Sequence, residues 1–161
     1  MGKILERIEN FDYWMISNVR RWAMPFARFS IFIVYFWSGI LKLLSLSPLN
    51  PIISELITKT IPGVPLNNLL IVLGVFEIII ALTIINHSLR HLALFFLTLH
   101  LIVVILPLFL LPEFTWSGFL IPTLEGRFII DNILTIALMI VILAHLHPLV
   151  YKEKNKLEKI A

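Results

Sequence analysis

The segment LLIVLGVFEIIIALTII, residues 69–85, contains one charged side chain, Glu77, among residues that are almost all apolar. A helix of about 20 predominantly apolar residues crosses the ~30 Å hydrocarbon core of a bilayer. Hydropathy indicates three more such segments, at about residues 25–46, 91–111 and 128–146. The sequence therefore predicts an all-α integral membrane protein whose residues 25–147 form a four-helix bundle.

The composition agrees with a membrane protein. Hydrophobic residues make up 59% of the 161 residues and charged residues only 14%, whereas soluble domains have about 25% charged residues. The length allows one domain and leaves no room for a separate soluble catalytic domain. The chain has no cysteine, which excludes disulfides, thiolate metal sites and thiol-based redox catalysis.

The N-terminal residues 1–24 have apolar side chains at helical spacing from Ile4 to Trp22, with charged and amide side chains mostly on the other side. This pattern is typical of an amphipathic helix that lies in the membrane interface. Pro25 lacks a backbone N–H, which does no harm in a first helical turn. We therefore expect the first span to begin at Pro25.

The segments outside the predicted spans are expected to differ in structure. Asn50 and Pro51 favour a short helix that runs through Ile61 between the first two spans. Residues 112–127 are predicted to be a loop, and residues 148–161 a basic tail. The apolar side chains of the short helix are expected to face the membrane, namely Ile53, Leu56, Ile57 and Ile61.

The distribution of lysine and arginine predicts the orientation. In a four-span topology only Lys42, Lys59 and Arg127 fall on one side, and the other ten of the 13 basic residues fall on the opposite side. Basic residues are enriched in cytoplasmic segments. We expect both termini to lie in the cytoplasm, with the spans in the cytoplasmic (inner) membrane. Because the charges gather at the span ends, the net charge of +3 does not indicate a nucleic-acid partner.

Ionisable side chains inside the spans are the candidate functional residues. Each costs about 2.5–3.5 kcal/mol at a span centre and usually faces the bundle interior. Glu77 and His100 are expected near the midplane, and Lys42 and Asp131 about one turn from the outer end. One interpretation is a structural ion-pair network of Lys42, Glu77 and Asp131. The other is a polar pocket in which Glu77 and His100 handle protons, on a stripe with Tyr35, Ser38 and Lys42.

Four other histidines fall at the predicted inner end of the spans, namely His87, His91, His145 and His147. Four imidazoles at one level can bind a metal or a haem. Histidines near lipid phosphates are also ordinary interfacial residues. We predict no metal site, and keep these four histidines as the weaker alternative.

Three short motifs follow one another along residues 25–145. They are Arg28 with Ile33–Leu43 and Ser47-Pro48, then Leu73–Ile78, then Leu111–Glu113 with residues 122–130. In this order they resemble the motifs of the DoxX family of small four-span membrane proteins. Asp131 stands where that family usually has a lysine, and Asn132 follows it.

The resemblance implies a subunit of a quinol oxidase or of a thiosulfate:quinone oxidoreductase, or a role in resistance to oxidants. The third motif adds Glu125, Arg127 and Asn132 to the candidate pocket residues. The expected function is that of a quinone- or lipid-like-ligand-binding subunit of a membrane redox system, with Lys42, Glu77 and His100 around the polar head. A quinone is the expected cofactor, and the expected partners are the bilayer, a redox subunit and a second copy of the chain.

Two alternatives remain open. One is a non-catalytic assembly or interaction protein whose polar network is structural. The other is a small oligomeric transporter or channel. The sequence leaves undecided whether the chain is an enzyme.

The topology can be tested by cysteine labelling, because the chain has no native cysteine. The orientation predicts that Thr115→Cys reacts with an impermeant maleimide in intact cells and that Asn155→Cys does not. The reverse labelling pattern would show that the orientation is wrong.

Overall fold

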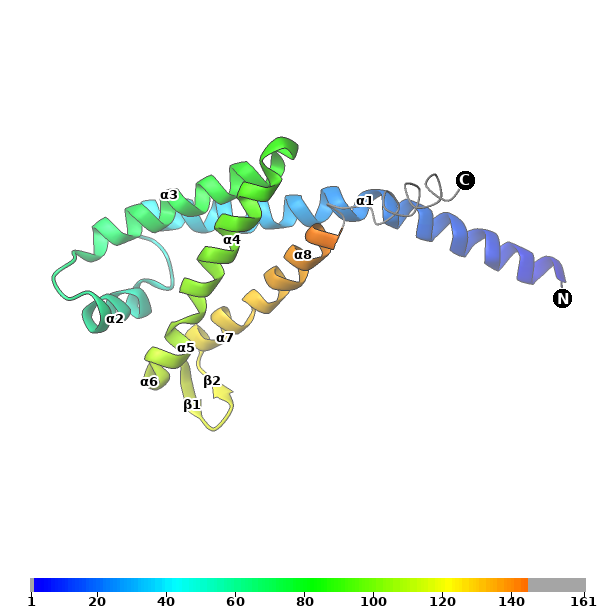
Figure 1. The fold of residues 1–161 in the computed structure, drawn as a ribbon. Coiled ribbons are helices and arrows are strands. Elements are labelled where there is room, and N and C mark those ends of the chain that lie inside the picture. Colours follow the sequence, from blue (N-terminus) through cyan, green and yellow to red (C-terminus); the bar gives the residue numbers. More distant parts are fainter. Residues whose placement is uncertain (1, 145–161) are drawn as a thin grey trace, which may run out of the picture.

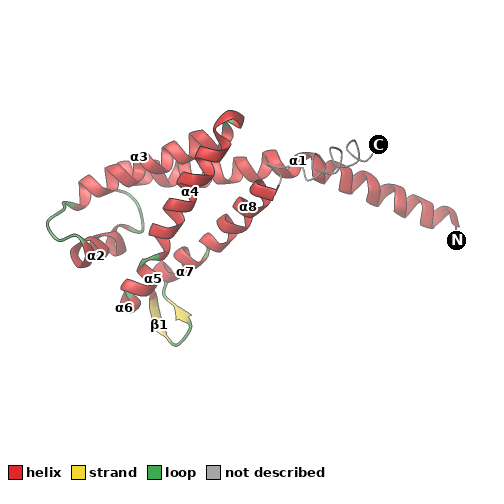
Figure 2. Ribbon diagram, viewed as in Figure 1, coloured by secondary structure: helices red, strands yellow, loops and turns green. Residues whose placement is uncertain are grey.

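The computed structural model describes residues 2–144, which are mostly helical, with two short strands and the loops that connect these elements (Figures 1 and 2). In chain order the elements are α1 (Gly2–Leu43), α2 (Asn50–Thr60), α3 (Leu66–Ile85), the 3-10 helix η1 (His87–Leu89), α4 (Arg90–Ile105), α5 (Pro107–Leu110), α6 (Pro112–Thr115), β1 (Trp116–Gly118), β2 (Ile121–Pro122), α7 (Leu124–Ile130) and α8 (Asn132–Ala144).

Within residues 2–144, four helical segments are long and apolar enough to cross a membrane. They are Asn10–Leu43, Leu66–Ile85, Arg90–Leu110 and Leu124–Ala144. The four segments expected from hydropathy are therefore confirmed in length and composition. The third combines α4 with α5, and the fourth combines α7 with α8, so both are interrupted rather than uniform helices.

The predicted helix boundary at Pro25 is wrong, because α1 continues through this residue. A proline inside a helix removes one backbone hydrogen bond and costs about 3 kcal/mol. The flanking residues, Ala23 and Met24 before it and Phe26 and Ala27 after it, hold no glycine or capping residue that would end the helix. The N-terminal part of α1 projects beyond the other helices (Figure 1).

Helix α1 ends three residues before the predicted boundary at Leu46. Its C-terminus has the two hydrogen bonds of a Schellman motif, from Leu46 N–H to the Leu41 carbonyl (2.8 Å) and from Ser45 N–H to the Lys42 carbonyl (3.0 Å). Ser45 takes the left-handed conformation that this motif requires, with φ of 57°. The hydrophobic run continues past the helix end, so hydropathy placed the boundary too late.

Two glycines bring α1 and α3 together. Figure 1 shows α3 running back along α1. A Cβ atom on Gly39 would lie 2.8 Å from the Gly74 carbonyl oxygen, and one on Gly74 would lie 2.8 Å from the Gly39 carbonyl oxygen. Small residues at a crossing let two helix backbones approach closely. Gly74, Glu77 and Ala81 share the buried face of α3.

The largest apolar core joins the four long segments. It contains Ile31 of α1, Ile84 of α3, Leu97 of α4 and Ile142 of α8, each at most 2% exposed. Helix α4 packs on α3, and α8 packs on α1 and α4. The side chains that face away from this core are mostly large and apolar, as a lipid environment requires.

Helix α2 is present where the sequence predicts it, but its orientation is not as expected. Ile57 is buried, and Ile53 and Leu56 are partly buried against a cavity, so these side chains face the protein. Ile61 is exposed. Lys59 Nζ also donates to the Leu110 carbonyl oxygen (2.5 Å), which ties the end of α2 to α5.

Residues 112–127 are not an unstructured loop. The strands β1 and β2 pair antiparallel, and the Thr123 side chain caps α7 by accepting from Gly126 N–H (3.1 Å). Thr115 is fully buried, so it is a poor site for the labelling experiment above. Phe119, 92% exposed between the two strands, should replace it.

The Gly39–Gly74 crossing predicts that Gly39→Ala destabilises the protein. The new methyl group would meet the Gly74 carbonyl oxygen and the Ile78 side chain, both at 2.8 Å. Overpacking typically costs about 1–3 kcal/mol, more than the ~0.5–1 kcal/mol that alanine gains over glycine in a helix. Thermal unfolding in detergent should show a lower Tm.

Gly118→Ala is the matched control, because a Cβ there meets only Ile121 at 3.4 Å, an ordinary contact. This variant should keep the wild-type Tm. An unchanged Tm for Gly39→Ala would contradict the close approach of the two helices.

Candidate functional site

A buried ion pair joins α1 to α3. Lys42 Nζ lies 2.7 Å from Glu77 Oε1 and 2.9 Å from Oε2. The two residues are 5% and 3% exposed. One of the two interpretations of the sequence paired these residues, and the structure contains that ion pair.

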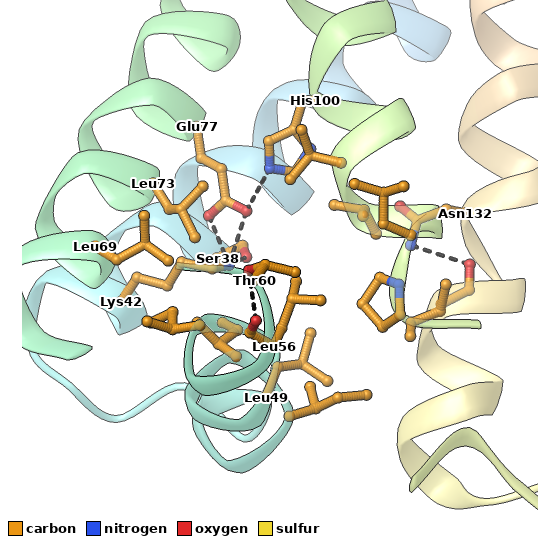
Figure 3. Close-up of a pocket in the computed structure, with 18 of the residues that line it drawn as sticks. Ser38, Lys42, Leu49, Leu56, Thr60, Leu69, Leu73, Glu77, His100 and Asn132 are labelled. Carbon is orange, nitrogen blue, oxygen red and sulfur yellow. Dashed lines mark hydrogen bonds and ion pairs between the residues drawn. The ribbon is translucent and has the colours of Figure 1, made fainter. Parts of the chain in front are cut away.

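The geometry follows from the direction in which helical side chains point. Side chains on a helix lean toward its N-terminus. Lys42 leans back by one turn, where its Nζ also donates to Ser38 Oγ (2.9 Å). Glu77 leans back along α3, which runs the other way, so the two side chains converge (Figure 3).

Helix α4 supplies the third member of the cluster. His100 Nε2 lies 3.0 Å from Glu77 Oε1, and His100 is 5% exposed. We refer to Lys42, Glu77 and His100 as the polar triad. An ammonium group has three N–H donors, and here they face Ser38 Oγ and the two carboxylate oxygens. The charged groups of the triad thus satisfy one another.

Two polar atoms beside the triad have no hydrogen-bond partner in the described structure, the Tyr35 hydroxyl and His100 Nδ1. The rings of Tyr35 and His100 pack edge to face, with their centroids 5.2 Å apart. A buried polar atom without a partner costs about 1–3 kcal/mol. This part of the site can therefore still accept or donate hydrogen bonds.

The polar triad forms one end of a cavity of about 370 Å³. Such a volume lies at the lower end of the range for small-molecule sites. Helices α1, α2, α3, α4 and α8 contribute to its lining, and Figure 3 shows α2 closing the side opposite Glu77. Most lining residues are aliphatic, including Leu56, Leu69 and Leu73.

The structure brings most of the candidate residues together. Tyr35, Ser38 and Asn132 line the cavity with the triad. Asn132 uses its amide to donate to the carbonyl oxygens of Phe128 (3.1 Å) and Ile129 (3.3 Å), which stabilises the junction of α7 with α8. Its side-chain N–H groups are thus directed toward α7.

The remaining candidates lie elsewhere. Asp131 is exposed at the junction of α7 with α8, and within residues 2–144 it forms no ion pair. The prediction that it joins the network of Lys42 and Glu77 is wrong, and His100 takes that place. Glu125 is half-buried and Arg127 exposed, and neither lines the cavity. Hydropathy does not reveal that these three side chains lie outside the cavity.

The four-histidine metal or haem site falls largely outside the described part of the chain. His145 and His147 lie beyond residue 144, and the side chain of His87 is not described. His91 is exposed. Within the described residues, no group of three or more His, Asp or Glu side chains could hold a metal ion.

Sequence reasoning missed the contribution of α2 to the cavity. Its apolar residues recur at helical spacing, a pattern that fits a protein-facing side as well as a membrane-facing one. Ile52 of this helix is buried against Leu111 and Ile129. Glu55 and Lys59 on the same helix were the available signal, because they indicate that only one side of α2 is apolar.

Comparisons of the chain with protein-family models, with curated proteins and with solved structures found no match.

Pairing within the triad predicts that Glu77→Gln destabilises the protein. Removing the carboxylate leaves the Lys42 charge buried and uncompensated, at a cost of about 3–5 kcal/mol. Adding Lys42→Met removes that charge and should recover part of the loss. Chemical unfolding of the single and double variants measures both effects.

Glu125→Gln is the control, since this carboxylate is outside the cavity. It should unfold like the wild type. If Glu77→Gln also retains wild-type stability, the ion pair does not contribute to the stability of the folded protein.

Proposed function

We propose that this protein is an integral membrane four-helix bundle that binds a quinone- or lipid-like ligand in the cavity beside the polar triad. In this proposal the bundle lies in the cytoplasmic membrane with both termini in the cytoplasm.

One observation carries the proposal: a mostly aliphatic cavity ends at a buried cluster of polar side chains. Ligand sites typically combine apolar walls with a few convergent polar groups that fix the orientation of the ligand. The aliphatic walls suit a hydrocarbon chain, and the polar end suits a head group. The four apolar helical segments support a ligand that is dissolved in the membrane.

The proposal assigns the chain to a membrane redox system, as the family resemblance implies. The chain has no cysteine, so electrons would reach the ligand through a partner subunit. Tyr35 and His100 are groups that can pass protons to or from such a ligand. The chain itself would position the head group and keep it away from water.

A structural role is the second candidate. The observation that favours it is that Lys42 and Glu77 compensate each other's charge, with Ser38 and His100 as further hydrogen-bond partners. A polar network whose charges are compensated without a ligand can serve only to fix how α1, α3 and α4 pack. In that case the chain is an assembly or interaction protein, and its cavity holds no specific ligand.

Leu73→Trp separates the two candidates. Leu73 lies in the cavity near Glu77 (Figure 3), so an indole there should occupy the ligand volume. We expect wild-type protein to co-purify with a stoichiometric amphipathic molecule, found by mass spectrometry of the lipid extract. The Leu73→Trp variant should retain about tenfold less of it, which corresponds to ~1.4 kcal/mol of affinity.

The neighbouring Val72→Trp is the matched control, because Val72 is 63% exposed and lines no part of the cavity. It should retain the wild-type amount. Equal small-molecule content in all three preparations would favour the structural role.

A further inference from the structure

A second hollow adjoins the cavity on the outer side of α1. Its volume is about 360 Å³, and it lies between α1, the turn that leads into α2, and α7. Val34, Ser38 and Leu49 line both hollows. These three residues therefore form the boundary across which the two spaces adjoin.

The second hollow faces the surroundings of the protein. Trp37 and Phe128 line it and are 64% and 45% exposed. None of the described residues that line it is charged, and two of them, Ser38 and Ser47, carry hydroxyl groups. An apolar hollow that opens along a membrane-spanning helix is accessible to hydrocarbon chains of the bilayer.

The polar end of the first cavity determines the kind of head group. Among the described residues that line it, only Lys42 and Glu77 are charged, and they compensate each other at 2.7 Å. A charged head group would enter this site without a free counter-charge, so its desolvation would go uncompensated. Hydrogen bonding remains available at the Tyr35 hydroxyl and at His100 Nδ1.

Ser38 lines both the first cavity and the second hollow. Its hydroxyl accepts from Lys42 Nζ at the polar end of the first cavity, and its side chain also lines the second hollow. A molecule that spans this residue can place a polar head beside the triad and a hydrocarbon chain against Trp37.

We propose that the ligand is an uncharged amphipath, with a hydroxyl or carbonyl head in the first cavity and a single hydrocarbon chain that passes Ser38 into the second hollow. The ligand then enters sideways from the bilayer, between α1 and α7. This inference rests on the proposed ligand-binding function and adds the charge of the head group and the path of its chain.

The fluorescence of Trp37 can report whether the hydrocarbon chain of the ligand lies in the second hollow. Replacing Trp14, Trp22 and Trp116 by Phe leaves Trp37 as the single tryptophan. The probe is a monoacylglycerol with bromine atoms at mid-chain, which quench indole fluorescence on contact. In nanodiscs of unbrominated lipid, we expect saturable quenching of Trp37 that excess unbrominated monoacylglycerol relieves.

The control reporter is the same background with Trp37→Phe and Val72→Trp, which places the indole on the exposed face of α3. It should show only weak, non-saturable quenching. Equal quenching of the two reporters would overturn the proposed chain path.

A fatty acid with the same brominated chain tests the head group. At about pH 9 its carboxyl group is ionised, and we expect it to quench Trp37 much less than the monoacylglycerol does. Stronger binding of the ionised fatty acid would overturn the assignment of an uncharged head.

A further variant, Leu41→Trp, carries no other substitution, and its bound ligand is measured by lipid extraction. Because Leu41 lines only the second hollow, the new indole should fill that hollow and leave the first cavity unchanged. It should lower ligand retention, whereas Leu44→Trp, an exposed position that lines neither hollow, should not. Retention that falls in Leu73→Trp but not in Leu41→Trp would overturn the chain path alone. Retention unchanged in both would contradict ligand binding itself.

Discussion

The packing of the helices depends on how the charges of Lys42 and Glu77 are compensated in an apolar interior. An unpaired Lys42 or Glu77 would be costly at this depth, and pairing requires that α1 and α3 lie close together over this stretch. Gly39 and Gly74 allow this closeness, because neither has a side chain to hold the backbones apart. Helix α4 then supplies His100, whose Nε2 lies 3.0 Å from Glu77 Oε1. The packing of three long helices is thus specified at one polar cluster within an interior that is otherwise mostly apolar.

This polar cluster also borders a space that the apolar side chains leave open. The helices α1 and α3 are held together near the triad, while α4 and the fourth segment diverge from them on the side covered by α2. A cavity with aliphatic walls and a polar end is the result. The same residues can therefore stabilise the fold and orient a ligand, which is why stability and ligand content have to be measured separately in the variants of Glu77 and Leu73.

Access to the cavity depends on which surfaces of the protein would contact the bilayer. Much of the outer surface of α1, including Trp37, is exposed and apolar, and the second hollow lies along it. A ligand with a hydrocarbon chain would remain in an apolar medium throughout its entry, so no large opening toward water is required. In the proposed site, the compensated charges at the polar end would select against ions, which would give a simple physical basis for discrimination between amphipaths of equal chain length.

The sequence alone determined those features of the fold that follow from hydropathy and from the rise per residue of a helix. Four apolar segments, the short helix α2, and the similar depth of Glu77 and His100 all follow from the order of the residues. Only the tertiary structure decided what depends on the rotation of each helix about its axis. That rotation turns Asp131 outward and the apolar side of α2 inward, and no periodic pattern distinguishes a lipid-facing apolar side from a protein-facing one. The order of residues 112–127 was likewise decided by contacts and hydrogen bonds between segments that hydropathy treats separately.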